Sequence, residues 1–130
     1  MKKILLFAMM CLLLAGTAVA QEGQEVTRAT FATGIEDREP VESITEYYPA
    51  EGGSVYFFTE LKNMQDTQVQ HVWYNNGEET YRFTSNVKSP RWRTNSRMQA
   101  AHFKSGDEIT VEVVGGANGE VYESMTLKIR

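Results

Sequence analysis

The sequence predicts an all-β domain on three observations. Apolar and polar residues alternate in short runs, most clearly at 109–113, where Ile109, Val111 and Val113 share one face. Turn residues separate these runs, and Asn76-Gly77 is a strong hairpin signal. No segment carries an apolar stripe at helical spacing over a useful length. About seven such runs fit an immunoglobulin-like antiparallel β-sandwich.

The first twenty residues have the layout of a secretory signal peptide. Lys2 and Lys3 precede an apolar run from Ile4 to Leu14, and Ala18-Val19-Ala20 supplies small residues for cleavage. The run is shorter than the roughly 20 residues that a membrane-spanning helix needs, and no later run approaches that length. We therefore expect a protein without a membrane span, exported to the periplasm or secreted by a Gram-negative-type bacterium.

Removal of residues 1–20 leaves 110 of the 130 residues, and these contain no cysteine. This composition excludes disulfides, thiol catalysis and cysteine-ligated metals from the mature chain. A chain of about 100 residues can bury one adequate core, so we expect a single domain. Residues 21–28 are polar and aperiodic and are expected to form a flexible lead-in to a sandwich domain over 29–130.

Seven strands are expected between the turns, at 29–35, 54–62, 68–74, 79–87, 91–99, 109–113 and 121–129. The segment 36–40 is expected to close the first strand, and 41–50 is ambiguous. Strand 54–62 is rich in aromatic residues, which predicts burial on both of its faces.

Alternation assigns each strand side chain to one face of its sheet. In 68–74 it places Val69, His71 and Trp73 on one face and Gln70, Val72 and Tyr74 on the other. In the strands 79–87 and 121–129 the residues expected to point inward are Tyr81, Phe83, Val87, Val121, Met125, Leu127 and Ile129.

Charge is unevenly distributed along the chain. Without Lys2 and Lys3, 11 basic side chains against 17 acidic ones leave a net charge of −6, which argues against a general nucleic-acid binder. The stretch 22–60 is rich in acidic residues, whereas 81–104 contains six basic residues and no acidic one. This asymmetry marks 81–104 as a candidate interaction surface.

Two segments, His71-Val72-Trp73-Tyr74 and Arg91-Trp92-Arg93-Thr94-Asn95-Ser96, carry a family resemblance. The chain resembles the bacterial domain of unknown function family DUF 2914, in which a His-x-Trp strand precedes a Trp-Arg-x-x-Ser run. The corresponding residues here, which we interpret as structural, are His71, Trp73, Trp92, Arg93 and Ser96.

The similarity extends over about Thr30 to Arg130 and includes 57–61, which resembles the aromatic strand preceding the two motifs. Near the C-terminus the family often has Gly-x-Trp-x-Val, whereas this chain has no tryptophan at 106–111. The resemblance implies a small β domain of the cell envelope and supplies no activity.

The candidate ligand or partner surface lies in 91–99. If this strand is extended, Arg91, Arg93, Asn95 and Arg97 point to one side at intervals of about 7 Å, and Trp92 points to the other. Three guanidinium groups in a row suit phosphates, uronic acids or carboxylates, and Trp92 or Tyr74 could add a stacking surface. The alternative is that Glu36, Asp37, Glu39 or Glu46 pairs with these arginines within the molecule.

His71 and Trp73 are better explained as residues of the hydrophobic core than as metal-binding, catalytic or ligand-binding residues. With only His102 as a second histidine, no zinc-ligand spacing is present, and we expect no metal and no cofactor. A histidine on an apolar strand face is favoured to be buried with its nitrogens hydrogen-bonded. A tryptophan on a middle strand of a sandwich is favoured to occupy the core.

Three functions remain open at this point. The favoured one is a non-catalytic module that binds another protein of the cell envelope. The second is binding of an acidic glycan or another anionic polymer through the candidate surface Arg91, Trp92, Arg93, Arg97 and Tyr74. The third, a hydrolase, has little support because no catalytic motif is present, and we expect the protein not to be an enzyme.

Overall fold

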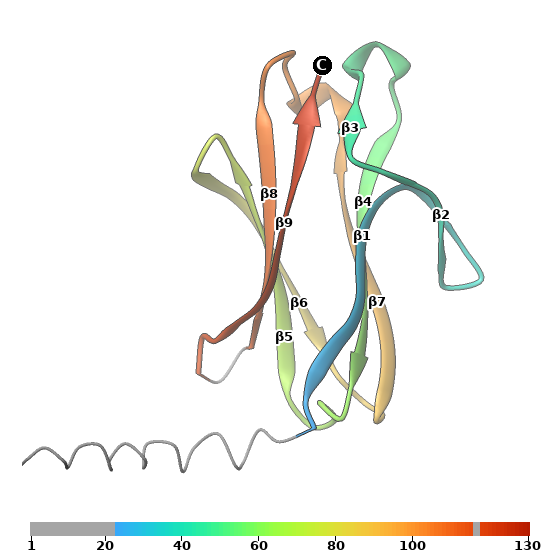
Figure 1. The fold of residues 1–130 in the computed structure, drawn as a ribbon, viewed down its shortest axis with the longest axis vertical. Helices are drawn as coiled ribbons and strands as arrows, with labels where there is room; N and C mark the ends of the chain where they lie inside the picture. Colours follow the sequence, from blue (N-terminus) through green and yellow to red (C-terminus); the bar gives the residue numbers. More distant parts are fainter. Residues whose placement is uncertain (1–22, 116–117) are drawn as a thin grey trace, which may run out of the picture.

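The computed structural model describes residues 23–115 and 118–130, and the expected signal peptide lies outside this part of the chain. Two β-sheets pack face to face with the core between them, as Figure 1 shows. The predicted all-β, immunoglobulin-like fold class is confirmed. Among the described residues no helix has the length and apolar character needed to cross a membrane.

The first sheet has four antiparallel strands in the order β2-β1-β4-β7. These strands are β1 (Glu25–Glu36), β2 (Glu39–Ile44), β4 (Ser54–Lys62) and β7 (Arg91–Gln99). β4 is a central strand and is buried on both sides, as its aromatic composition predicts. Phe57 faces the core, and Phe58 is covered on the outer face, where the Arg28 guanidinium carbon lies 5.0 Å from its ring centroid.

The second sheet has five strands in the order β3-β9-β8-β5-β6. They are β3 (Glu46–Tyr47), β5 (Gln68–Asn75), β6 (Glu78–Asn86), β8 (Glu108–Gly115) and β9 (Val121–Ile129). All pairs are antiparallel except β3 and β9. Asn76 and Gly77 both have positive φ, at 52° and 89°, which is the backbone of a two-residue hairpin turn between β5 and β6.

The described residues form nine strands, two more than the predicted seven. Both additional strands, β2 and β3, come from residues 39–47, for which the pattern was ambiguous or favoured a turn. β2 is mostly exposed and lies at a sheet edge, so it has no apolar alternation and tolerates Pro40. β1 begins at Glu25 and therefore takes in 25–28 of the expected lead-in.

The core lies between the sheets and is centred on Trp73, which is completely buried. Phe31 and Phe57 pack edge-to-face with ring centroids 5.0 Å apart, and Phe31 reaches Trp73 at 6.2 Å. Two residues predicted to point inward are not covered: Tyr81 is 41% exposed and Val121 is 49% exposed. Tyr81 lies on the edge strand β6 and lines a groove rather than the closed core.

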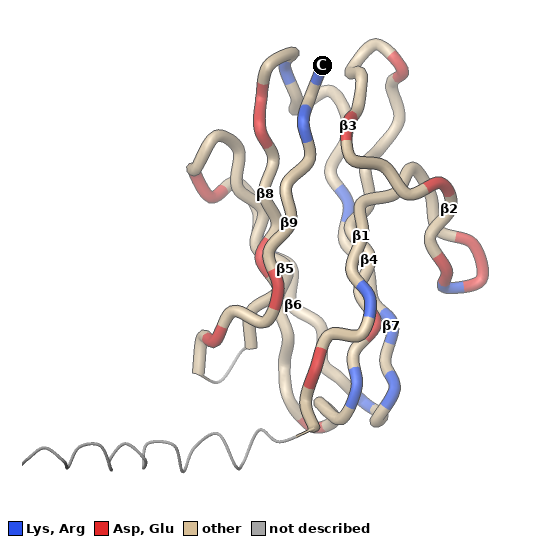
Figure 2. The backbone as a smooth tube through the Cα atoms, in the orientation of Figure 1, with Lys and Arg blue, Asp and Glu red and all other residues tan. Residues whose placement is uncertain are grey.

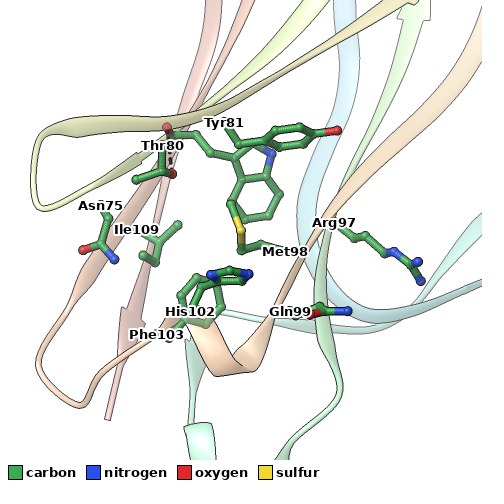
Figure 3. Close-up of a pocket in the computed structure, with 10 residues that line it drawn as sticks. Asn75, Thr80, Tyr81, Arg97, Met98, Gln99, His102, Phe103 and Ile109 are labelled. Atoms are coloured by element: carbon green, nitrogen blue, oxygen red, sulfur yellow. Dashed lines mark hydrogen bonds between the residues drawn. The ribbon is translucent and has the colours of Figure 1, made fainter.

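Two short 3-10 turns close one end of the sandwich. They are η1 (Pro49–Glu51) and η2 (Ala100–His102), and the second directly follows β7. η2 thereby places His102 and Phe103 beside the β5–β6 hairpin, where Figure 3 shows them with Asn75 and Ile109.

Candidate ligand-binding groove

His71 and its partners connect the two sheets through the core. Its side chain has no exposed surface, and its Nε2 lies 3.0 Å from Thr59 Oγ1 while its Nδ1 lies 2.8 Å from Ser96 Oγ. The indole Nε1 of Trp73 donates to the same Ser96 oxygen at 2.9 Å. Thr59 and Ser96 belong to the first sheet, and His71 and Trp73 to the second.

Burial determines the protonation of His71. Transfer of an imidazolium out of water is unfavourable, so burial lowers the pKa of His71 to about 3. The ring is therefore neutral at physiological pH, and each of its nitrogens has a hydroxyl partner. A sealed and neutral imidazole can hold the layers together but cannot reach a substrate.

Trp92 connects the layers at a second point. It lies on the core-facing side of β7, is partly buried, and donates from Nε1 to Ser85 Oγ of β6 at 3.1 Å. Because β6 and β7 are edge strands of different sheets, this hydrogen bond closes one side of the sandwich near the end of β6. Its ring therefore does not stand on the face that carries the arginines.

The three arginines of β7 lie on the outer face of the first sheet, and two of them are paired. Arg91 Nε donates to Glu60 Oε2 at 2.7 Å, and Arg93 Nη1 approaches Glu39 Oε2 at 2.5 Å. Arg28 of β1 completes the group, with both terminal nitrogens on Glu39 at 2.8 Å. Figure 2 shows basic positions along β7 and on β1, and β4 lies between these two strands in the sheet.

Glu39 is the centre of this ion-pair group. Hydrogen bonds from Arg28 and Arg93 to its carboxylate lower the pKa of Glu39 to about 2. Of the four acidic residues considered as partners from the sequence, the structure brings Glu39 to the arginines, and Glu60 of the adjacent strand is a further partner.

Arg97 and Tyr74 lie apart from this group. Arg97 is exposed and has no ion-pair or hydrogen-bond partner within the described part of the chain. Tyr74 belongs to the outer face of the second sheet, where its hydroxyl donates to Glu112 Oε1 at 3.2 Å. Burial and this carboxylate raise the pKa of the Tyr74 phenol. The five predicted surface residues thus do not form one surface.

A groove lies where β6 and β7 separate. It has a volume of about 430 Å³ and is shown in Figure 3. Its lining consists of Trp73, Asn75, Thr80, Tyr81, Arg97, Met98, Gln99, His102, Phe103 and Ile109. The apolar residues form its deep part, and the polar ones surround its mouth. Of the residues predicted to form a surface, only Arg97 belongs to it.

A second hollow lies at the end of β7. It has a volume of about 440 Å³, and Gln99 lines both hollows. Its other lining residues are Pro49, Gly52, Gly53, Ser54, Ala100 and Ala101, which belong to the ends of β4 and β7 and to the two 3-10 turns.

The sequence did not single out Tyr81, Gln99, His102 or Phe103 as site residues. Alternation along β6 assigned Tyr81 to the core side, which is correct for its face, but whether that face is covered depends on how far β7 lies from β6. The sequence signal that could have identified this site is an aromatic residue close to a polar turn on an edge strand. Within the described residues no group of three or more His, Cys, Asp or Glu side chains could hold a metal ion.

The fold defines the class of protein. An immunoglobulin-like protein from Pseudomonas aeruginosa, known from a crystal structure at 1.50 Å resolution, matches with a TM-score of 0.54 and 16% sequence identity. The match covers 85% of this chain and 99% of that chain. At this identity the likeness concerns the fold alone, and it makes this domain an immunoglobulin-like module.

Residues 66–129 match the family described as protein of unknown function (DUF2914). This match confirms the resemblance predicted from the two motifs. The match is shorter than the predicted extent, because β1 to β4 and the aromatic segment 57–61 precede it. No curated protein matches the chain.

Proposed function

We propose that this domain is an exported, non-catalytic module that binds another protein of the cell envelope. The observation that carries the proposal is the groove between the edge strands β6 and β7, which combines an apolar interior with polar residues at its mouth. Clefts of this composition and of roughly 300 to 1,000 Å³ are typical ligand sites. The amino-terminal layout of charged, apolar and small residues supports export.

Protein binding receives more support than glycan binding from the arrangement of the arginines. Arg91 and Arg93 already share carboxylates with Arg28, so their guanidinium groups are largely satisfied within the molecule. The Trp92 ring lies on the opposite side of β7 from them and bonds to Ser85. A row of free guanidinium groups beside a stacking ring, which the glycan alternative requires, is therefore not formed.

The position of the histidines supports a non-catalytic role. His71 is sealed in the core with a low pKa, so it cannot exchange a proton with a substrate near neutral pH. His102 is exposed on η2, and no hydrogen bond to its ring is present within the described chain. A general base normally needs a partner that orients it and a pKa tuned to its role.

Crosslinking in intact cells tests the proposal. The described lysines, Lys62, Lys88, Lys104 and Lys128, are all exposed and give an amine-reactive crosslinker access to several sides of the domain. Mass spectrometry of the crosslinked domain should recover the same envelope protein in independent experiments. A set of neighbours that changes from one repeat to the next would contradict the proposal.

A further inference from the structure

We propose that the groove between β6 and β7 binds an extended peptide segment of the envelope partner. One large apolar side chain of that segment fills the groove, and a nearby Asp or Glu side chain pairs with Arg97. This inference rests on the proposed function, because it assigns the partner's contact to a defined place on the domain.

The opening has a definite geometry. The hydrogen bond from Trp92 to Ser85 joins the two edge strands near the start of β7 and the end of β6. Towards the other end of β7 the strands diverge, and Figure 1 shows the β5–β6 hairpin turning away from β7. The groove occupies the space between Tyr81 of β6 and Met98 of β7. A side chain can therefore enter between the layers without breaking the sandwich.

The interior of the groove suits a large apolar side chain. Trp73, Phe103 and Ile109, each less than a tenth exposed, form the deep surface, and Met98 packs against the same core. The Tyr81 ring stands at the mouth with 41% of its surface exposed, although it is on the core-facing side of β6. Burial of apolar surface contributes about 25 cal/mol per Å² before the costs of binding, so an apolar anchor would stabilise the complex.

The backbone of β7 offers hydrogen bonds to an extended chain. The amide of Ala100 donates to Gly53 O at 2.9 Å, and that of Asn63 donates to Pro90 O at 2.7 Å. Both bonds belong to the β4–β7 register, in which hydrogen-bonded pairs alternate with non-bonded pairs. It follows that Arg93, Asn95 and Arg97 direct their N–H and C=O groups away from β4, towards the free edge.

An added strand can use these free edge groups. No other strand of the described chain pairs with β7 on that side, and peptide addition to a sheet edge is a recurrent mode of recognition. The main-chain bonds would give affinity, and the groove would select the side chain that enters it. The second hollow, which shares Gln99, leaves room for the bound segment to continue past the end of β7.

The charges around the groove indicate which residue of the bound segment flanks its apolar side chain. None of the ten residues that line the groove is acidic, although the chain as a whole carries a net charge of −4. Arg97 has no partner in the described structure, in contrast to Arg91 and Arg93 on the same strand. In Figure 3 its guanidinium points away from the apolar interior, towards the outside of β7. Arg97 can therefore reach a carboxylate of the bound segment that flanks the apolar side chain in the groove.

Selection from a random peptide library displayed on phage tests the inference on the mature domain. We expect the enriched peptides to share a large apolar residue within a few positions of an Asp or Glu. Tyr81→Ser and Arg97→Gln should each weaken binding of a synthetic enriched peptide about tenfold, which corresponds to about 1.4 kcal/mol. Titration calorimetry gives the affinities, and amide NMR spectra verify that each variant is folded.

Two matched variants serve as controls. Arg91→Gln removes an arginine that is paired with Glu60 at the other end of β7, and Tyr48→Ser removes a tyrosine that is 49% exposed and does not line the groove. Both should bind the peptide as the unchanged domain does. An absence of enriched peptides, enrichment without the apolar and acidic residues, or equal affinity in Tyr81→Ser and Arg97→Gln would overturn the inference.

Two other occupants of the groove have distinct signatures. A second copy of the domain would give a concentration-dependent dimer in sedimentation experiments, and Tyr81→Ser would dissociate it. An acidic polysaccharide occupant would be indicated by binding of polygalacturonate, used as a probe, with a strong dependence on salt and on Arg97. Either result, obtained without peptide binding, would overturn the inference.

Failure of this inference is distinguishable from failure of the proposed function. If crosslinking recovers one repeated envelope protein while the groove variants bind peptide unchanged, the function stands and the groove assignment fails. If crosslinking recovers only random neighbours, the proposed function fails whatever the library yields.

Discussion

At His71, two hydroxyl groups take the place of the water that would surround an exposed imidazole. Thr59 and Ser96 each contact one ring nitrogen, and Ser96 also accepts from Trp73, so the buried polar atoms of this group are paired. An unpaired polar group at this depth would cost roughly 1 to 3 kcal/mol. The arrangement gives the His, Trp and Ser of the two motifs, His71, Trp73 and Ser96, one shared structural role.

The sequence could favour a satisfied histidine but could not identify its partners. Alternation along 68–74 places His71 and Trp73 on one face, and the same rule places Ser96 on the inner side of its strand. Which strands face each other depends on the order of the strands in the two sheets. That order brings Thr59, which is 12 positions away along the chain, and Ser96, which is 25 positions away, into contact with His71. Nothing in the sequence around Thr59 indicates that it contacts His71.

The depressed pKa of His71 predicts that the domain loses stability in mild acid. Well above pH 6.5 the imidazole is neutral in both the folded and the unfolded state. As the pH falls from 6.5 towards 3, the unfolded chain binds a proton that the folded domain excludes. The free energy of unfolding should then fall by up to about 1.4 kcal/mol per pH unit from this group.

Urea unfolding at several pH values between 6.5 and 5 measures this slope. His71→Gln removes the titrating group, so its stability should depend less on pH in this window, although it is lower overall. His102→Gln changes the exposed histidine and should keep the slope of the unchanged domain. Equal slopes in the domain and in His71→Gln would contradict the explanation.

Among the elements, β2 depends most on charge. It is a short, largely exposed edge strand, and its first residue, Glu39, contacts Arg28 of β1 and Arg93 of β7. These ion pairs reach across the outer face of the sheet from its first strand in spatial order to its last. Surface pairs contribute little to global stability, so we infer that their effect is local.

Glu39→Gln should therefore loosen β2 while the rest of the domain is retained. Amide hydrogen exchange should become faster at 39–44, with little change in β5 or β8. Because the pKa of Glu39 is lowered to about 2, the contribution of its charge is present above pH 4.5 and is lost as the pH falls towards 2.

The matched control is Glu42→Gln on the same strand. Glu42 accepts a hydrogen bond from Thr33 Oγ1 at 2.9 Å and, among the described residues, has no arginine partner. Its replacement should leave exchange in β2 nearly unchanged. Similar acceleration in both variants would show that the arginine contacts do not hold this strand.

The elements with regular alternation could be predicted from the sequence, and those without it could not. β5, β7 and β8 turn one face to the core, so period-two patterns define them within a few residues, and β4 is recognised as an aromatic run that is buried on both faces. β2 and β3 lie at sheet edges and bury little, so nothing in their composition distinguishes them from turns. Tyr81 shows the limit of the method, since the pattern gives its face but not what lies opposite.

At the scale of the whole molecule, the fold class follows from many weak signals that agree with one another. Short runs, turn residues and the absence of helical periodicity all point to a sandwich. The groove does not follow, because it arises from the divergence of two edge strands that belong to different sheets. Local sequence patterns contain no information on how far β6 and β7 diverge.

The proposed export leads to a prediction about the mature chain. The peptide bond after Ala20 should be cleaved, so that the exported protein begins at Gln21, a few residues before β1. Intact-mass measurement on protein isolated from the periplasm or the medium gives the first residue directly. Recovery of the chain with Met1 and the apolar run still attached would contradict export by this route.

The chain itself crosses between the two layers on both long sides of the sandwich. On one side the chain itself passes from β2 in the first sheet to β3 in the second through Thr45, so a covalent hinge connects the layers. On the opposite side the chain passes from β6 in the second sheet to β7 in the first through residues 87–90, and the hydrogen bond from Trp92 to Ser85 lies beside this connection. Neither long side can therefore open along its full length without unfolding the strands that flank its crossing.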